Sequence, residues 1–187
     1  MHWPLLISGI ALIISLILWK RIEIVTREEW GARPPKSMVP FENPADYVII
    51  IHTATYTCKT KEECIQLMRV IQSFHVDSRK WPDVSYNFLV GGDGRVYEAR
   101  GWDVVGDHSK GYNEVSIGIA LMGIFCDERP PDFQIKTAQD LIREGVRRGK
   151  ISPDYKLVGH RQISPTESPG EKLFQDLQNW DHWSPDV

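Results

Sequence analysis

The sequence has few cysteines and little net charge, and it contains no internal repeat or low-complexity stretch. Its 187 residues carry a formal net charge of −3 at pH 7, without the basic balance typical of nucleic-acid-binding proteins. The three cysteines are Cys58, Cys64 and Cys126, and no further cysteine or histidine pair follows at the spacing of a zinc finger. These absences argue against nucleic-acid-binding, repeat and zinc-finger proteins.

The composition fits one globular domain. Apolar residues make up 42% of the chain and charged residues 25%, which is enough for an ample core. We therefore expect a single domain.

An almost unbroken apolar run extends from Trp3 to Trp19 and is followed by Lys20 and Arg21. Its 17 residues are at the short end of what a helix needs to cross a bilayer. A signal peptide is the alternative, but the sequence lacks both a basic segment before the run and a small-residue cleavage site after it. We expect residues 1–21 to form a hydrophobic membrane anchor or uncleaved signal segment, and residues 22–187 to form the domain.

Strands are predicted by a hairpin signal and by apolar runs. Gly91-Gly92-Asp93-Gly94 lies between Phe88–Val90 and Arg95–Glu98, as in a hairpin. The longest apolar run is expected to be a central strand. The other expected strands are Tyr47–His52, Val115–Phe125 (the longest run) and Lys156–His160.

Helices are predicted by spacing and by capping residues. Ile65, Met68 and Ile71 recur at helical spacing. The first expected helix covers residues 61 to about 79. The second begins at Thr137, with Asp140 three residues later as in a capping box, and ends at Gly149. The third is Gly170–Trp180. The proline-rich residues 34–44 are expected to be irregular. Strands mixed with helices predict an α/β fold with helices on the faces of a mixed sheet.

Four blocks carry a family resemblance: Tyr47–Ala54, Val84–Phe88, Gly159–Arg161 and Pro165–Gly170. Taken together they resemble the peptidoglycan recognition proteins, over about residues 22–180. That family shares its fold with bacteriophage-type zinc N-acetylmuramoyl-L-alanine amidases. The resemblance implies a central mixed β-sheet flanked by about three helices.

The same blocks predict that the catalytic metal is missing. In catalytic members the first block resembles V-I-I-H-H-T and the last T-x-C-P-G, and the first His, the later His and the Cys hold zinc. Here Ile51 and Ser168 replace two ligands and leave His160. Catalytic zinc needs about three protein ligands. His52 cannot substitute, because neighbouring strand residues point to opposite faces. We expect no metal, no other cofactor and no enzymatic activity.

The resemblance also implies a peptide-binding groove. Recognition of a muramyl peptide stem needs hydrogen-bonding groups, aromatic surfaces and a cation for carboxylate. The residues at matching positions are His52, His75, Arg79, Trp81, Tyr86, Arg100, His108, Asn113 and His160. Each has an ordinary structural alternative, such as a core histidine bonded to backbone or a core aromatic residue.

Arg100 is the clearest indication of specificity. Diaminopimelate carries one carboxylate more than lysine, and a guanidinium can bind it bidentately. In the family, Arg at this place accompanies diaminopimelate-type recognition. A neighbouring marker is half met, because Lys80 precedes Trp81 where diaminopimelate binders tend to have Gly. A solvated surface arginine is the alternative, and the acidic Asp107 could disfavour an anionic ligand nearby.

The cysteines indicate the compartment. Cys58 and Cys64 flank a short polar loop that can bring them within bridging distance, and members of the family carry a disulfide at this place. Zinc binding by the pair is the alternative. Disulfides persist in oxidising compartments, so we expect the domain to be extracellular. The positive charges of Lys20 and Arg21 after the apolar run would by themselves place the domain on the cytoplasmic side of the membrane. Cys126 is expected to be free and buried.

These observations predict a non-enzymatic pattern-recognition receptor of innate immunity that binds bacterial peptidoglycan, with diaminopimelate-type stems favoured. It is expected to be membrane-anchored, or alternatively secreted. Expected partners are a muropeptide, the membrane and a second copy or related receptor, but no nucleic acid. One alternative is a zinc amidase. The other is a decoy or co-receptor that does not bind the ligand, an interpretation that Lys80 and Asp107 support.

Overall fold

The structure is a computed structural model that describes residues 22–42 and 44–187. The expected anchor, residues 1–21, lies outside the described residues. Among the described residues, no helix combines the length and the apolar character needed to cross a bilayer.

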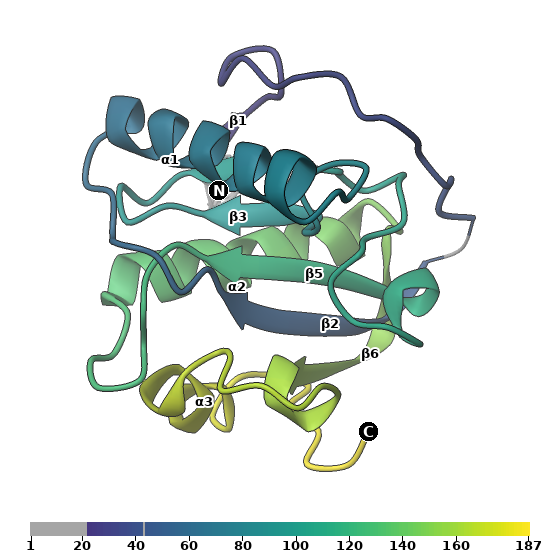
Figure 1. Ribbon diagram of the computed structural model, residues 1–187. Coiled ribbons are helices and arrows are strands. Elements are labelled where there is room, and N and C mark those ends of the chain that lie inside the picture. Colours follow the sequence, from purple (N-terminus) through teal and green to yellow (C-terminus); the bar gives the residue numbers. More distant parts are fainter. Residues whose placement is uncertain (1–21, 43) are drawn as a thin grey trace, which may run out of the picture.

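A mixed six-stranded sheet forms the centre of the domain (Figure 1). Its strand order is β1-β4-β3-β5-β2-β6. Only the β3–β4 hairpin is antiparallel, and the other neighbours pair in parallel. The strands are β1 Ile24–Val25, β2 Ala45–His52, β3 Phe88–Val90, β4 Val96–Glu98, β5 Ser116–Leu121 and β6 Ile151–Gly159. The predicted hairpin, the mixed sheet and the interior position of β5 are confirmed.

The two faces of the sheet are buried by different helices. Along β2, Val48 and Ile50 belong to the core that α2 covers, whereas Ile49 and Ile51 belong to the core that α1 covers. Both faces are therefore apolar, as expected for a parallel strand between two layers. Because β2 pairs with β5 on one side and with β6 on the other, its register is fixed.

In the described part of the chain, three α-helices flank the sheet: α1 Lys61–Ser73, α2 Asp132–Arg147 and α3 Glu171–Leu177. The α1 helix starts with a capping box between Thr60 and Glu63. It continues into a π-helical turn, η1 Phe74–Ser78. Short 3₁₀ turns are η2 Asn113–Val115 and η3 His160–Gln162, and α3 lies beside β6 at the sheet edge (Figure 1).

The expected start of the second helix is wrong. The α2 helix begins at Asp132, after Pro131, whereas Thr137 lies inside it. The Thr137 hydroxyl bonds the carbonyl of Phe133, one turn earlier, so it satisfies helix backbone without capping an end. The end of the helix is as predicted, since Gly149 follows it with φ +67°, a conformation that favours glycine.

Other boundaries differ by a few residues. The central strand β5 stops at Leu121 because the chain then turns away from the sheet, so the apolar run to Phe125 is only partly strand. In contrast, β6 begins at Ile151, earlier than the expected Lys156. The helix expected over residues 61–79 is α1 followed by the π turn.

A disulfide joins Cys58 to Cys64, with a Cα–Cα distance of 5.1 Å. It links the loop after β2 to the first turn of α1, and both cysteines are buried. The predicted disulfide is therefore confirmed. Cys126 is free, as expected, but it is partly exposed rather than buried.

Replacing both Cys58 and Cys64 with Ala should lower the free energy of unfolding by about 2 kcal/mol, because a short closed loop is released in the unfolded chain. Urea denaturation measures this change. Cys126→Ala is the matched control and should change stability little. A loss below about 0.5 kcal/mol in the double variant would contradict a stabilising role for the disulfide.

Candidate functional site

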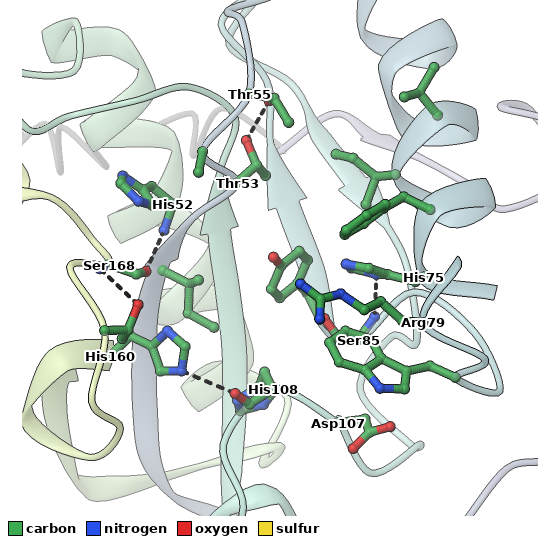
Figure 2. A pocket seen from close by; sticks show the side chains of 18 residues that line it. His52, Thr53, Thr55, His75, Arg79, Ser85, Asp107, His108, His160 and Ser168 are labelled. Atoms are coloured by element: carbon green, nitrogen blue, oxygen red, sulfur yellow. Dashed lines mark hydrogen bonds between the residues drawn. The ribbon is translucent and has the colours of Figure 1, made fainter. Parts of the chain in front are cut away.

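A groove of about 650 Å³ opens at the carboxyl end of β2. Figure 2 shows its two walls: the end of α1 with η1 on one side, and the chain from His160 to Ser168 on the other. The loop that carries Asp107 and His108 lies at its lower edge in this view. Most of the residues expected to bind a ligand come together here: His52, His75, Arg79, Trp81, Tyr86, His108 and His160.

The wall formed by η1 is aromatic. The His75 ring lies 4.9 Å from that of Trp81 and 5.6 Å from that of Tyr86, measured between centroids. Nδ1 of His75 accepts a hydrogen bond from the backbone N–H of Ser85 at 3.2 Å, and burial lowers the pKa of His75 to about 4. Burial also raises the pKa of Tyr86 to about 12. At neutral pH these side chains are uncharged, and Arg79 is the cation of this wall.

The opposite wall is tied together by hydrogen bonds (Figure 2). The Ser168 hydroxyl accepts from the backbone N–H of His52 at 3.2 Å, and Nε2 of His160 donates to the His108 carbonyl at 3.1 Å. The His52 ring lies against Phe125, whose backbone N–H donates to Nδ1 of His52 at 3.4 Å. Burial lowers the pKa of both His52 and His160. Both histidines thus bond backbone while lining the groove.

Zinc, which the fold implies, does not fit the residues of this wall. Ile51, His160 and Ser168 all line the groove, but they supply one imidazole, one hydroxyl and one side chain without a lone pair. The His52 ring packs on the Phe125 side of the sheet, opposite the core that Ile51 joins. Over residues 22–42 and 44–187, no group of three or more His, Cys, Asp or Glu is arranged to hold a metal ion.

His108 occupies a space that two glycines leave open. A Cβ at either Gly106 or Gly118 would lie 2.4 Å from the His108 ring. Burial lowers the pKa of His108 to about 3, and its Nε2 has no hydrogen-bond partner in the described part of the chain. Asn113 does not line the groove. Its side-chain oxygen accepts from the backbone N–H groups of His108 and Ser109, at 2.9 and 2.8 Å, and so shapes this loop.

Arg100 lies behind the groove wall. Its side chain is only 7% exposed, so the alternative of a solvated surface arginine is wrong. Nε donates to the Val84 carbonyl at 2.7 Å and Nη1 to the Val105 carbonyl at 2.9 Å. The side chain lines a second cavity, of about 190 Å³, and not the groove. The nearest carboxylate is that of Asp107, with Oδ2 3.7 Å from Nη2. Asp107, unlike Arg100, lines the groove.

Sequence reasoning missed several groove residues. Val70 and Phe74 line it from α1 and η1 and remain 54% and 48% exposed. The signal of Val70 was available, since it is an apolar residue outside the stripe of Ile65, Met68 and Ile71. Phe74 lies three residues after Ile71, so its spacing predicted a buried position. Thr53 and Thr55, joined by a 2.7 Å hydrogen bond, follow the carboxyl end of β2, where site residues of parallel sheets gather.

The groove offers aromatic and apolar surface, neutral hydrogen-bonding groups and the guanidinium of Arg79, which stacks near Phe74 and Trp81. Such a set suits an extended polar ligand that carries carboxylates and amides.

Comparison with known proteins identifies the family. The family model for N-acetylmuramoyl-L-alanine amidase matches residues 41–171. Peptidoglycan-recognition protein SC1a/b of Drosophila simulans is 39% identical over 184 residues, which cover 96% of this chain and 100% of the relative.

Two solved structures are similar as well. One is the ectodomain complex of peptidoglycan recognition proteins LCa and LCx bound to tracheal cytotoxin, at 49% identity and TM-score 0.85, covering 87% of this chain and 99% of that one. The other is peptidoglycan recognition protein LE in complex with tracheal cytotoxin, a monomeric diaminopimelic acid-type peptidoglycan. It has 43% identity and TM-score 0.85, and covers 86% of this chain and 95% of that one. From the identity, the coverage and the shared fold, this chain belongs to the peptidoglycan recognition protein family.

Proposed function

We propose that this chain is a non-enzymatic receptor that binds the muramyl peptide stem of bacterial peptidoglycan, with diaminopimelate-type stems favoured, in innate immunity. One observation carries the proposal. The groove has aromatic and hydrogen-bonding walls, and the two positions at which the family resemblance implies zinc ligands in catalytic relatives are occupied by Ile51 and Ser168. The relatives LCx with LCa, and LE, solved with tracheal cytotoxin, support a ligand of this class.

The groove suits the chemistry of a peptide stem. Arg79 supplies a charge-assisted hydrogen bond to a carboxylate, and Trp81 and Tyr86 supply flat surfaces beside it. The neutral histidines present hydrogen-bonding atoms without adding charge. The Ser168 hydroxyl accepts a hydrogen bond from the backbone of β2 and so stabilises the wall opposite Arg79.

The location of the domain is part of the proposal. We infer that residues 1–21 anchor the chain in a membrane and that the domain lies outside the cell, with secretion as the alternative. The disulfide between Cys58 and Cys64 supports an oxidising compartment. A second copy or a related receptor is a partner consistent with the solved ectodomain complex of LCa and LCx.

The first prediction concerns Arg79. Arg79→Ala should weaken the binding of a monomeric diaminopimelate-type muropeptide about tenfold, because a charged hydrogen bond is worth roughly 1.5–3 kcal/mol. Isothermal titration calorimetry measures the affinity. Arg33→Ala is the matched control, since Arg33 pairs with Asp77 away from the groove lining and its loss should leave affinity unchanged. An equal loss in both variants would count against the assigned groove.

The second prediction concerns the metal. The wild-type domain should take up no stoichiometric zinc and release no stem peptide from muropeptides. A double variant, Ile51→His with Ser168→Cys, should gain zinc beside His160, because it supplies three donors at one place. Metal analysis of purified protein, with either single variant as control, checks the zinc content, and an assay for free stem peptide after incubation with muropeptides checks the turnover. Stoichiometric zinc and turnover in the wild type would favour the amidase alternative.

The third prediction follows from the buried histidines. The folded pKa values of His75 and His108, about 4 and about 3, lie below the ordinary value of 6.5. The unfolded chain therefore binds more protons, and stability present above pH 6.5 is lost as pH falls towards 4. Between pH 7 and pH 5 each histidine should cost about 1–2 kcal/mol.

Urea denaturation at pH 7, 6 and 5 tests this dependence. His75→Gln keeps an acceptor for the Ser85 N–H and removes one titrating group, so it should reduce the loss of stability over this range. An unchanged pH dependence in that variant would show that His75 is not responsible.

A further inference from the structure

One carboxylate of the chain itself faces the groove. Asp107 lines the groove at its lower edge in Figure 2, and its side chain is 42% exposed. Its backbone N–H donates to the Ser85 carbonyl at 2.7 Å, so the residue is held beside the aromatic wall. The backbone of Asp107 is therefore held at the rim, and its carboxylate lies at the edge of the groove.

The partner of this carboxylate is an incompletely bonded cation. Nη2 of Arg100 is buried and has no hydrogen-bond partner among the described residues. Asp107 approaches it to 3.7 Å, close enough for attraction between charges but beyond a good hydrogen bond. The other nearby carboxylate, Asp83, is already paired with Arg27 at 2.8 Å. Arg100 is thus left with Asp107 as its loose counter-ion.

The charge of Arg100 reaches the groove. It helps to lower the pKa of His75 on one wall and of His108 at the lower edge, after the larger effect of burial. A positive potential from a buried guanidinium therefore acts on the space between these two histidines. An anionic group entering that space would be attracted by Arg100 and repelled by Asp107.

We propose that Asp107 is a specificity-determining residue that competes with a ligand carboxylate for Nη2 of Arg100. The inference rests on the proposed function of the groove. A carboxylate that reached Nη2 at hydrogen-bonding distance would form the bond that Asp107 does not form. To do so it must displace Asp107 or lie beside its like charge, and this cost reduces the affinity for ligands with a free carboxylate at this position. A ligand with an amide there does not meet the same repulsion.

Calorimetric titration of the wild type and of Asp107→Asn with two probes tests the proposal. The probes are a monomeric diaminopimelate-type muropeptide and the same muropeptide with the diaminopimelate carboxylate amidated. Asp107→Asn should bind the free-carboxylate form about fivefold tighter or more and the amidated form equally well, as expected when like charges are separated. The ratio of the affinity for the free-carboxylate probe to the affinity for the amidated probe should therefore be higher in the variant than in the wild type.

Two comparisons make the result decisive. Glu114→Gln removes an equal charge from an exposed site in the next turn and should change neither affinity. Urea midpoints confirm that each variant is folded. Equal affinities of wild type and Asp107→Asn for the free-carboxylate probe, or an equal gain for both probes, would overturn the role of Asp107 while leaving the receptor function intact. Binding of neither probe by any variant would overturn the receptor function itself, and this inference with it.

Discussion

The alternation of side chains along β2 is the constraint on which the site depends. Hydrogen bonding to β5 and β6 on either side fixes the register, so Ile51 must face the α1 core and the groove, and His52 must face Phe125. A slip of one residue would bring a histidine to position 51 but would turn every apolar side chain of the strand to the wrong face. Ile51 has no atom that could bind a metal ion, and His52 therefore cannot supply a metal ligand at position 51.

The shape of the groove comes from hydrogen bonds to the backbone. Its walls are held by contacts that run through the backbone: Ser168 to β2, His160 to the His108 carbonyl, and His75 to Ser85. Burial keeps the histidines neutral, so the local electrostatics come from Arg79 in the groove and from the Arg100–Asp107 pair beside it. We infer that binding depends on the two walls of the groove, whereas selectivity for the charge of the ligand depends on Arg100 and Asp107.

Much of this could be predicted from sequence because it is encoded locally or by motifs. The hairpin follows from Gly91–Gly94, and the disulfide from Cys58 and Cys64 with the family pattern. The location of Arg100 could not be predicted, because it depends on how the loops that carry the Val84 and Val105 carbonyls fold around its guanidinium. The start of α2 was missed because Thr137, a good capping residue, bonds instead to the backbone within the helix.

We infer that the groove holds a peptide stem without the help of a metal ion. The most direct measurement is a calorimetric titration of the purified domain with a monomeric diaminopimelate-type muropeptide, before and after exhaustive treatment with a chelator. We expect saturable binding with the same affinity in both samples. Loss of binding after chelation, with recovery when zinc is returned, would contradict it.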